Sequence, residues 1–226
     1  MSKFEGFGPG VRRWFQGLEA DNSKEYFTAH RGVFEESVRG QMEALLDELA
    51  GKFGGEVKMF RHNRDIRFSA DKSPYKTNTY GVIYGSSIAA QGLYASISAR
   101  GLVAGSGYHT MARDQLERYR EQVHDAKHGR ELARLVAKTE KAGLELWGQT
   151  LATSPRGYAK EHDRIDLLRR KSLSLGASLP FGRGIDRSSG LQFATKTWRA
   201  AAPVTCWLDE HVGASALPVS RPQRRR

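Results

Sequence analysis

The sequence lacks several features that define particular classes of protein. It has one cysteine, Cys206, so no disulfide can form within the chain, and its neighbours Val204 and Trp207 favour a buried free thiol over a nucleophile. No apolar run approaches the length of about 20 residues that a membrane-spanning helix requires. Residues 1–6 lack the apolar core of a secretory signal. We therefore expect a cytoplasmic protein with no membrane partner.

Common catalytic and metal-binding signatures are also missing. The sequence has no Gly-x-Ser-x-Gly, His-Glu-x-x-His or Cys-x-x-Cys pattern, and no Gly-Lys-Ser/Thr of a P-loop follows its glycine cluster at residues 101–107. His124 and His128 lie one helical turn apart, but no third ligand stands at a recognisable spacing, so a solvated helix face is the better interpretation. We predict no metal site, and the sequence indicates neither a cofactor nor an oligomeric state.

Acidic residues are outnumbered in this chain. The chain has 25 Asp and Glu residues and 36 Lys and Arg residues, which gives a net charge of +11. The arginines of residues 221–226 carry four of these charges and leave +7 for the rest of the chain. A basic body favours anionic partners such as nucleic acid, nucleotides or phosphorylated metabolites. The tail at residues 221–226 is predicted to be disordered.

Length and composition are those of a folded globular protein. The 226 residues can bury a core without disulfides, and 39% hydrophobic with 27% charged residues argues against disorder. Apolar residues recur at helical spacing over residues 11–18 and 22–53. The second stretch is predicted to be one long helix, with Asn22 as its N-cap and Glu25 completing a capping box.

The middle of the chain changes to a strand pattern. Strands are predicted at residues 57–60, 80–84, 93–98 and 102–108. Their short connections require antiparallel pairing. Helical spacing then returns at residues 116–123, 132–139, 165–171 and 191–211, the last kinked or broken at Pro203. This order predicts a single α+β domain over residues 1–220, in which the long N-terminal helix and the C-terminal helices flank an antiparallel sheet of about four to six strands.

The most informative stretch runs from residue 61 to residue 76. Five cationic side chains and two carboxylates leave it a local charge of +3: Arg61, Arg64, Arg67, Lys72, Lys76, Asp65 and Asp71. A guanidinium group presents a planar fork of donors that matches phosphate and carboxylate. The stretch therefore points to an anionic ligand.

Alternation within this stretch separates two faces. An extended backbone over residues 60–68 places Arg61, Asn63, Asp65 and Arg67 on one face and His62, Arg64, Ile66 and Phe68 on the other. Asp65 between two arginines would stay ionised and hold both in position, which makes an anion clamp. Arg64, half-buried, would need a carboxylate partner such as Glu25 or Asp71. The alternative is a structural ion-pair network that pins an edge strand to the long helix.

A turn at residues 73–74 completes the motif. Lys72 and Lys76 are candidates to neutralise phosphate oxygens, and Tyr75 is a candidate to stack on a ligand or to donate its hydroxyl. The alternative is a surface turn in which Asp71 caps its own backbone and Tyr75 packs back on the sheet.

A second candidate region lies near residues 156–170. Arg156 and Tyr158 flank Gly157, which would let the backbone approach a ligand closely, and His162 could act as a general base near neutral pH. The alternative, a capped loop before an amphipathic helix, is the better interpretation for any single one of these residues.

The pattern Arg61-x-x-Arg64-Asp65-x-Arg67-Phe68-x-x-Asp71-Lys72-x-x-Tyr75 resembles the signature of the DUF2461 family of bacterial and fungal proteins. The chain is similar to that family in its length as well. It also shares the Asn-Ser-Lys-Glu-Tyr-Phe segment at residues 22–27, the Pro-Arg-Gly-Tyr loop at residues 155–158 and the Trp-Leu pair at residues 207–208. The resemblance implies a shared fold and a shared site, and it names no reaction.

Two functions follow from these residues. The first is an enzyme acting on a small phosphorylated or otherwise anionic substrate, in which the three arginines bind the anion, Asp65 orients them or acts as base, and Lys72 stabilises developing charge. The second is a non-catalytic nucleic-acid-binding protein that uses the basic surface with Tyr94, Tyr108 and the tail at residues 221–226. Aromatic residues interleaved with lysines would favour the second. The close alternation of arginine and aspartate favours the first.

Overall fold

The computed structural model describes residues 3–67 and 69–218. Phe68 and the predicted tail at residues 221–226 therefore lie outside the described part of the chain. Among the described residues, no helix combines the length and the apolar character that crossing a membrane would require.

The N-terminal third is helical but is not one long helix. Its elements are α1 (Pro9–Ala20), α2 (Lys24–Ala29), α3 (Arg31–Val33), the π-helical η1 (Phe34–Gly40) and α4 (Gln41–Phe53). The prediction of a continuous helix over residues 22–53 was wrong, because the backbone leaves helical geometry at His30 with φ −111° and ψ 18°. The N-cap is Ser23, whose Oγ accepts from the Tyr26 N–H at 3.0 Å, and not Asn22.

The six-stranded antiparallel sheet confirms the predicted fold class. The strands are β2 (Glu56–Met59), β3 (Asn78–Tyr84), β4 (Leu93–Ser98), β5 (Gly101–Tyr108), β6 (Glu145–Trp147) and β7 (Leu173–Pro180). Their order across the sheet is β2-β3-β4-β5-β7-β6. A separate pair, β1 (Gly6–Phe7) with β8 (Ile185–Asp186), joins the start of the chain to the start of the last helix.

Four helices complete the fold: α5 (Arg113–His124), α6 (Ala126–Lys141), α7 (Ile165–Leu168) and α8 (Arg187–His211). Of the predicted kink or break at Pro203, the break does not occur: α8 continues through Pro203, with Ala201 and Val204 buried on either side. Cys206 is exposed, contrary to prediction. The helical period turns Thr205, Trp207 and Leu208 inward and leaves Cys206 on the solvent side.

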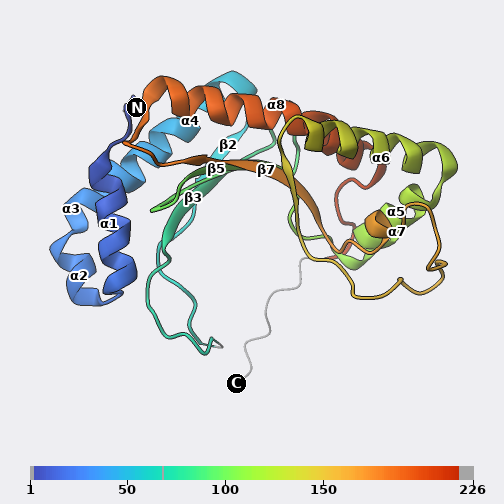
Figure 1. Cartoon of the computed structure of the whole chain (residues 1–226), viewed down its shortest axis with the longest axis horizontal. Coiled ribbons are helices and arrows are strands. Elements are labelled where there is room, and N and C mark those ends of the chain that lie inside the picture. Colours follow the sequence, from blue (N-terminus) through green and yellow to red (C-terminus); the bar gives the residue numbers. More distant parts are fainter. Residues whose placement is uncertain (1–2, 68, 219–226) are drawn as a thin grey trace.

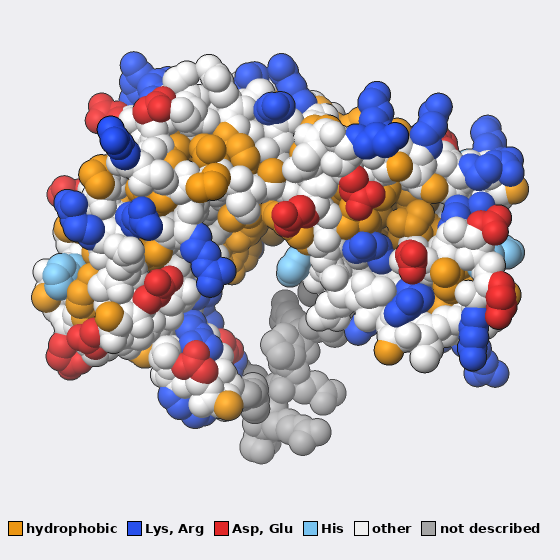
Figure 2. All heavy atoms as spheres, in the orientation of Figure 1, with side chains coloured by type: hydrophobic (Ala, Val, Ile, Leu, Met, Phe, Trp, Pro, Cys, Tyr) orange, Lys and Arg blue, Asp and Glu red, His pale blue; other side chains and the backbone are white. Residues whose placement is uncertain are grey.

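The two faces of the sheet are unlike. Residues directly opposite one another on paired strands share a face, so Ile83, Leu93, Ser106 and Leu175 form one continuous inward row. Helices α4 and α8 pack on this face (Figure 1). We call the opposite face, which curves under α8, the open face. Figure 2 shows a hollow below it, between the two ends of the molecule.

Candidate functional site

The predicted motif forms the connection between β2 and β3, here called the motif loop (residues 60–77). Beyond the sheet its two arms stay paired: Asn63 bridges Tyr75, the Arg64 N–H donates to the Pro74 carbonyl at 2.8 Å, and the Lys76 N–H donates to the His62 carbonyl at 3.0 Å. The resulting extension hangs below the sheet (Figure 1). Every second residue points outward, as the alternation predicts.

The exposure of the first arm follows that alternation residue by residue. Exposed side chains are those of Arg61, Asn63, Asp65 and Arg67, whereas His62 is buried and Arg64 and Ile66 are half-buried. Phe68, assigned to the second face, lies outside the described residues.

The arginines of the loop are paired with its own carboxylates. Arg64 pairs with Asp71, one of the two partners expected for it. Arg67 holds Asp65 through two bonds, Nε to Oδ1 at 2.9 Å and Nη2 to Oδ2 at 2.6 Å. These bonds from Arg67 lower the pKa of Asp65 to about 2. Both carboxylates therefore stay ionised and neutralise two of the three guanidinium groups.

The lysines and the turn are satisfied within the loop as well. Lys72 Nζ donates to the Ile66 carbonyl at 3.1 Å, and Lys76 Nζ donates to the Arg61 carbonyl at 2.6 Å. Asp71 Oδ1 accepts from the Ser73 N–H at 2.9 Å and from Ser73 Oγ at 2.6 Å, and these bonds lead the lowering of the Asp71 pKa. The loop thus resembles the structural network that was the alternative to the clamp.

This network leads to a prediction about two aspartates. Asp65→Asn should change the melting temperature little, since the Asp65–Arg67 pair is solvated and such pairs contribute little to stability. Asp71→Asn should lower the melting temperature more, because Asp71 caps the turn and also holds the half-buried Arg64. Thermal denaturation of both variants measures the order. Equal effects would mean that the loop is not organised by Asp71.

Two residues of the motif loop, Tyr75 and His62, attach the loop to the N-terminal helices. The Tyr75 ring stacks on Phe27 with ring centroids 4.3 Å apart. The Asn22 side-chain amide makes two hydrogen bonds with the Tyr75 backbone. Its Oδ1 accepts from the Tyr75 N–H at 2.9 Å, and its Nδ2 donates to the Tyr75 carbonyl at 3.2 Å. Only 8% of Tyr75 is exposed, so its ring is a structural anchor and offers no surface for stacking a ligand.

A cavity of about 430 Å³ is lined by the motif loop, the start of β3 and the end of α1 with the residues that follow it. Its lining includes Arg64, Asp71, Tyr75 and Lys76 from the predicted set, together with Glu19, Asn22, Ser73, Thr77 and Asn78. Arg61, Arg67 and Lys72 do not line it. Its cationic and acidic side chains are balanced in number, Arg64 and Lys76 against Glu19 and Asp71.

The second candidate region is far from the motif loop. Arg156 and Tyr158 lie in the loop between β6 and α7, at the other end of the molecule (Figure 1). His162 Nδ1 accepts from the Arg164 N–H at 3.0 Å, and its Nε2 lies 3.1 Å from His124 Nδ1. Both ring nitrogens are therefore engaged, and His162 is not positioned as a base. Within residues 3–67 and 69–218 no group of three or more metal-ligating side chains comes together.

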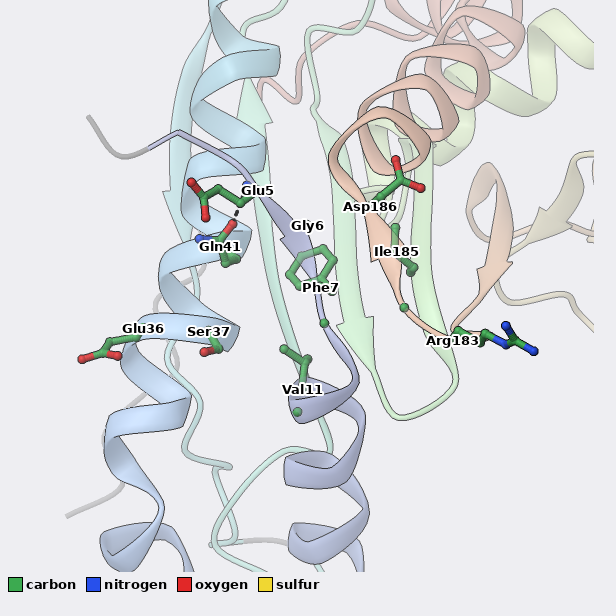
Figure 3. A pocket seen from close by; sticks show the side chains of 13 residues that line it. Glu5, Gly6, Phe7, Val11, Glu36, Ser37, Gln41, Arg183, Ile185 and Asp186 are labelled. Carbon is green, nitrogen blue, oxygen red and sulfur yellow. Dashed lines mark hydrogen bonds between the residues drawn. The ribbon is translucent and has the colours of Figure 1, made fainter.

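A second cavity, of about 710 Å³, lies between β1, β8 and η1. Its lining includes three acidic residues, Glu5, Glu36 and Asp186, and one basic residue, Arg183. Figure 3 shows Glu36 and Arg183 pointing away from each other and from the space between the strands and the helix. Asp186 is already used to cap α8, accepting from the Ser189 N–H at 2.9 Å. The acidic lining does not suit an anion.

The open face carries a feature that the sequence reading missed. Phe60 stacks on Tyr80 with centroids 4.8 Å apart, and Tyr80 lies 5.7 Å from Tyr94. We call these three rings the aromatic row. Lys58 Nζ lies 5.6 Å from the Phe60 ring centroid, and Lys76 Nζ lies 4.7 Å from that of Tyr80. Aromatic and lysine side chains are thus interleaved across β2, β3 and β4.

Tyr108, the other tyrosine expected on a binding surface, is not on this face. It is buried, and its hydroxyl lies 3.0 Å from Asp209 Oδ1 in α8. Burial and this carboxylate raise its pKa. Its position on β5 puts it on the helix-covered side, so Tyr94 alone of the two tyrosines faces the hollow.

A family model described as a conserved hypothetical protein (DUF2461) matches residues 11–207. The matched span includes the whole sheet, the motif loop and most of α8. A search of curated proteins found no match.

Proposed function

The chain belongs to the DUF2461 family of conserved hypothetical proteins. Because that membership names no reaction, the proposal must come from the geometry of the structure. We propose that the protein binds single-stranded nucleic acid on the open face. The observation that carries this proposal is the aromatic row with its lysines. Rings at half-buried positions on an uncovered sheet face offer stacking surfaces, and the adjacent ammonium groups suit phosphates.

Charge supports the same ligand. Lys58 and Arg61 are exposed beside the row, Lys76 is half-buried there, and the chain outside its last six residues has a net charge of +7. Figure 2 shows Lys and Arg side chains gathered over the motif loop at the edge of the hollow. Base stacking on aromatic side chains tolerates any sequence, so this arrangement suits a strand bound with little sequence preference.

The pairing inside the motif loop weighs against a dedicated anion clamp. Arg64 and Arg67 already hold carboxylates, so an incoming anion must displace them or add to an occupied guanidinium. A base stacked on Tyr80 displaces no ion pair of the loop. The motif loop then acts as the wall of the site and the sheet as its floor.

A small anionic ligand remains the second candidate, because the 430 Å³ cavity has the volume of a small-molecule pocket and holds Arg64 and Lys76. The enzyme hypothesis assigns the base to Asp65 and charge stabilisation to Lys72, and neither residue lines this cavity. Both would first leave their present partners, Arg67 and the Ile66 carbonyl.

The test is binding of fluorescein-labelled oligothymidylate, followed by anisotropy at 50 mM and 200 mM salt. Wild type should bind, and affinity should fall steeply with salt. Tyr80→Ala should weaken binding roughly 5- to 150-fold, since one stacked base contributes about 1–3 kcal/mol. Tyr158→Ala, at the other end of the molecule, is the matched control and should bind as wild type does.

Two results would contradict the proposal: absence of oligonucleotide binding at 50 mM salt, or equal weakening by both substitutions. If inorganic phosphate or a mononucleotide raises the melting temperature by mass action while oligonucleotide does not bind, the small-anion candidate replaces it.

A further inference from the structure

A fourth ring, Trp147, lies on the open face at the opposite edge of the sheet. Trp147 pairs with Ser174 at the end of β6. Its indole crosses the neighbouring strands and lies against Gly176 of β7 and Gly105 of β5, where a Cβ on either glycine would overlap the ring. Only glycine leaves room for the indole there, so these two residues hold the ring flat on the sheet.

The glycines also bring Trp147 toward the aromatic row. Gly105 is directly opposite Tyr94, and Gly176 is directly opposite Gly105. The sheet from β2 to β6 therefore carries Phe60, Tyr80, Tyr94 and then the indole, with no bulky side chain at the two intervening positions. Trp147 is half-buried, so part of the ring faces solvent.

We infer that Trp147 is the far end of one binding path, on which a single strand crosses the whole sheet from β2 to β6. This inference rests on the proposed function. Neighbouring strands lie about 4.8 Å apart, so the five steps from β2 to β6 span roughly 24 Å. That width suits several nucleotides, in keeping with sites of about 4–16 nucleotides in single-strand-binding domains.

Polar groups around the indole fit this role. Ser174, directly opposite Trp147, is only 7% exposed, and its hydroxyl has no hydrogen-bond partner among the described residues. That oxygen is shielded from solvent, so a base edge beside the ring would reach it only if the indole shifts. Arg170 Nη1 lies 3.4 Å from the Trp147 carbonyl and supplies a positive charge at this edge. This charge offsets the negative charge of Glu145, which is exposed on β6, the strand of Trp147.

The indole provides its own readout. The other three tryptophans, Trp14, Trp198 and Trp207, are at most 3% exposed, so a ligand-dependent change in tryptophan emission should come from Trp147. Titration of wild type with oligothymidylates of 2, 4, 8 and 12 nucleotides should quench emission with the longer strands and not with the dinucleotide. Trp147→Phe should abolish the quenching.

Affinity gives the second measurement. Trp147→Ala should weaken binding of the 12-mer at least 5-fold by anisotropy and leave the weak binding of the dinucleotide unchanged. General damage to the fold would weaken both lengths alike, and circular dichroism of the variant checks for it. Tyr80→Ala, which removes a ring common to both lengths, should weaken both.

The outcomes separate this inference from the proposed function. If the 12-mer binds wild type and Trp147→Ala equally and emission does not change, the path ends before β6, and the proposal for the aromatic row stands. If no oligonucleotide binds wild type, both fail.

Discussion

Replacing Trp198 by alanine is expected to lower the free energy of unfolding by about 3–5 kcal/mol, the usual cost of emptying a large buried aromatic site. Trp198 is fully buried in α8, where it meets Phe53 of α4 edge-on with ring centroids 5.8 Å apart. Its Nε1 donates to the Tyr94 carbonyl at 3.1 Å. The substitution therefore removes both a core ring and the bond that ties α8 to β4 behind the aromatic row.

Trp198→Phe separates these two contributions. It keeps much of the volume and loses the hydrogen bond, so a cost of about 1–2 kcal/mol is expected. Urea denaturation of wild type and both variants measures the differences. A loss below 1 kcal/mol for Trp198→Ala would contradict the role of this residue in holding α8 on the sheet.

Acidification from pH 7 to pH 4 is expected to remove about 3 kcal/mol of stability through His62 alone. The His62 ring is 6% exposed, and its nearest aromatic neighbours are Phe34, with centroids 4.6 Å apart, and Trp14 at 5.5 Å. Nδ1 lies 3.3 Å from Thr79 Oγ1, and Nε2 has no hydrogen-bond partner among the described residues. Burial, and secondarily the charge of Lys76, lower the pKa of His62 from 6.5 to about 4.

The direction of the effect follows from proton binding. Between pH 6.5 and pH 4 the unfolded chain binds a proton at His62 that the folded protein excludes. Stability is therefore complete above pH 6.5 and declines as the pH falls toward 4. Because His62 lies where the motif loop meets the helices, partial opening of the loop should accompany the decline.

His62→Phe is the matched control, since phenylalanine fits an aromatic surrounding and does not titrate. The other histidines contribute to both proteins, so the difference between the two curves of unfolding free energy against pH isolates His62. The curve of the variant should lack the decline between pH 6.5 and 4. Parallel curves would show that protonation of His62 is not linked to folding.

Local sequence chemistry predicted much of the fold and part of the site. Periodicity of two and of 3.6 residues distinguished strands from helices, and short connections required the antiparallel sheet that the structure has. It also gave Asp71 as one of two possible partners for Arg64, and a turn capped by Asp71 as the alternative to a phosphate-binding turn; the structure has both contacts. These contacts join residues within about ten positions of each other, so spacing alone brings the groups together.

The break at His30 escaped prediction because helical spacing continues through it. Val33, Phe34 and Val38 keep the apolar period, and what changes is the path of the backbone, which bends so that Trp14, Phe27 and Phe34 surround His62. Tertiary packing of this kind overrides local propensity. The same packing turned Tyr75 from a candidate ligand contact into an anchor.

The sequence by itself determined the fold class and the basic charge, since the first depends on local periodicity and the second on composition. Only the tertiary structure decided which aromatic side chains share one face of the sheet. Phe60, Tyr80, Tyr94 and Trp147 come from four segments, and strand register places them on one face of the sheet. Alternation assigns each residue to one of two faces, but only the packing of α4 and α8 determines which face is covered and which stays open.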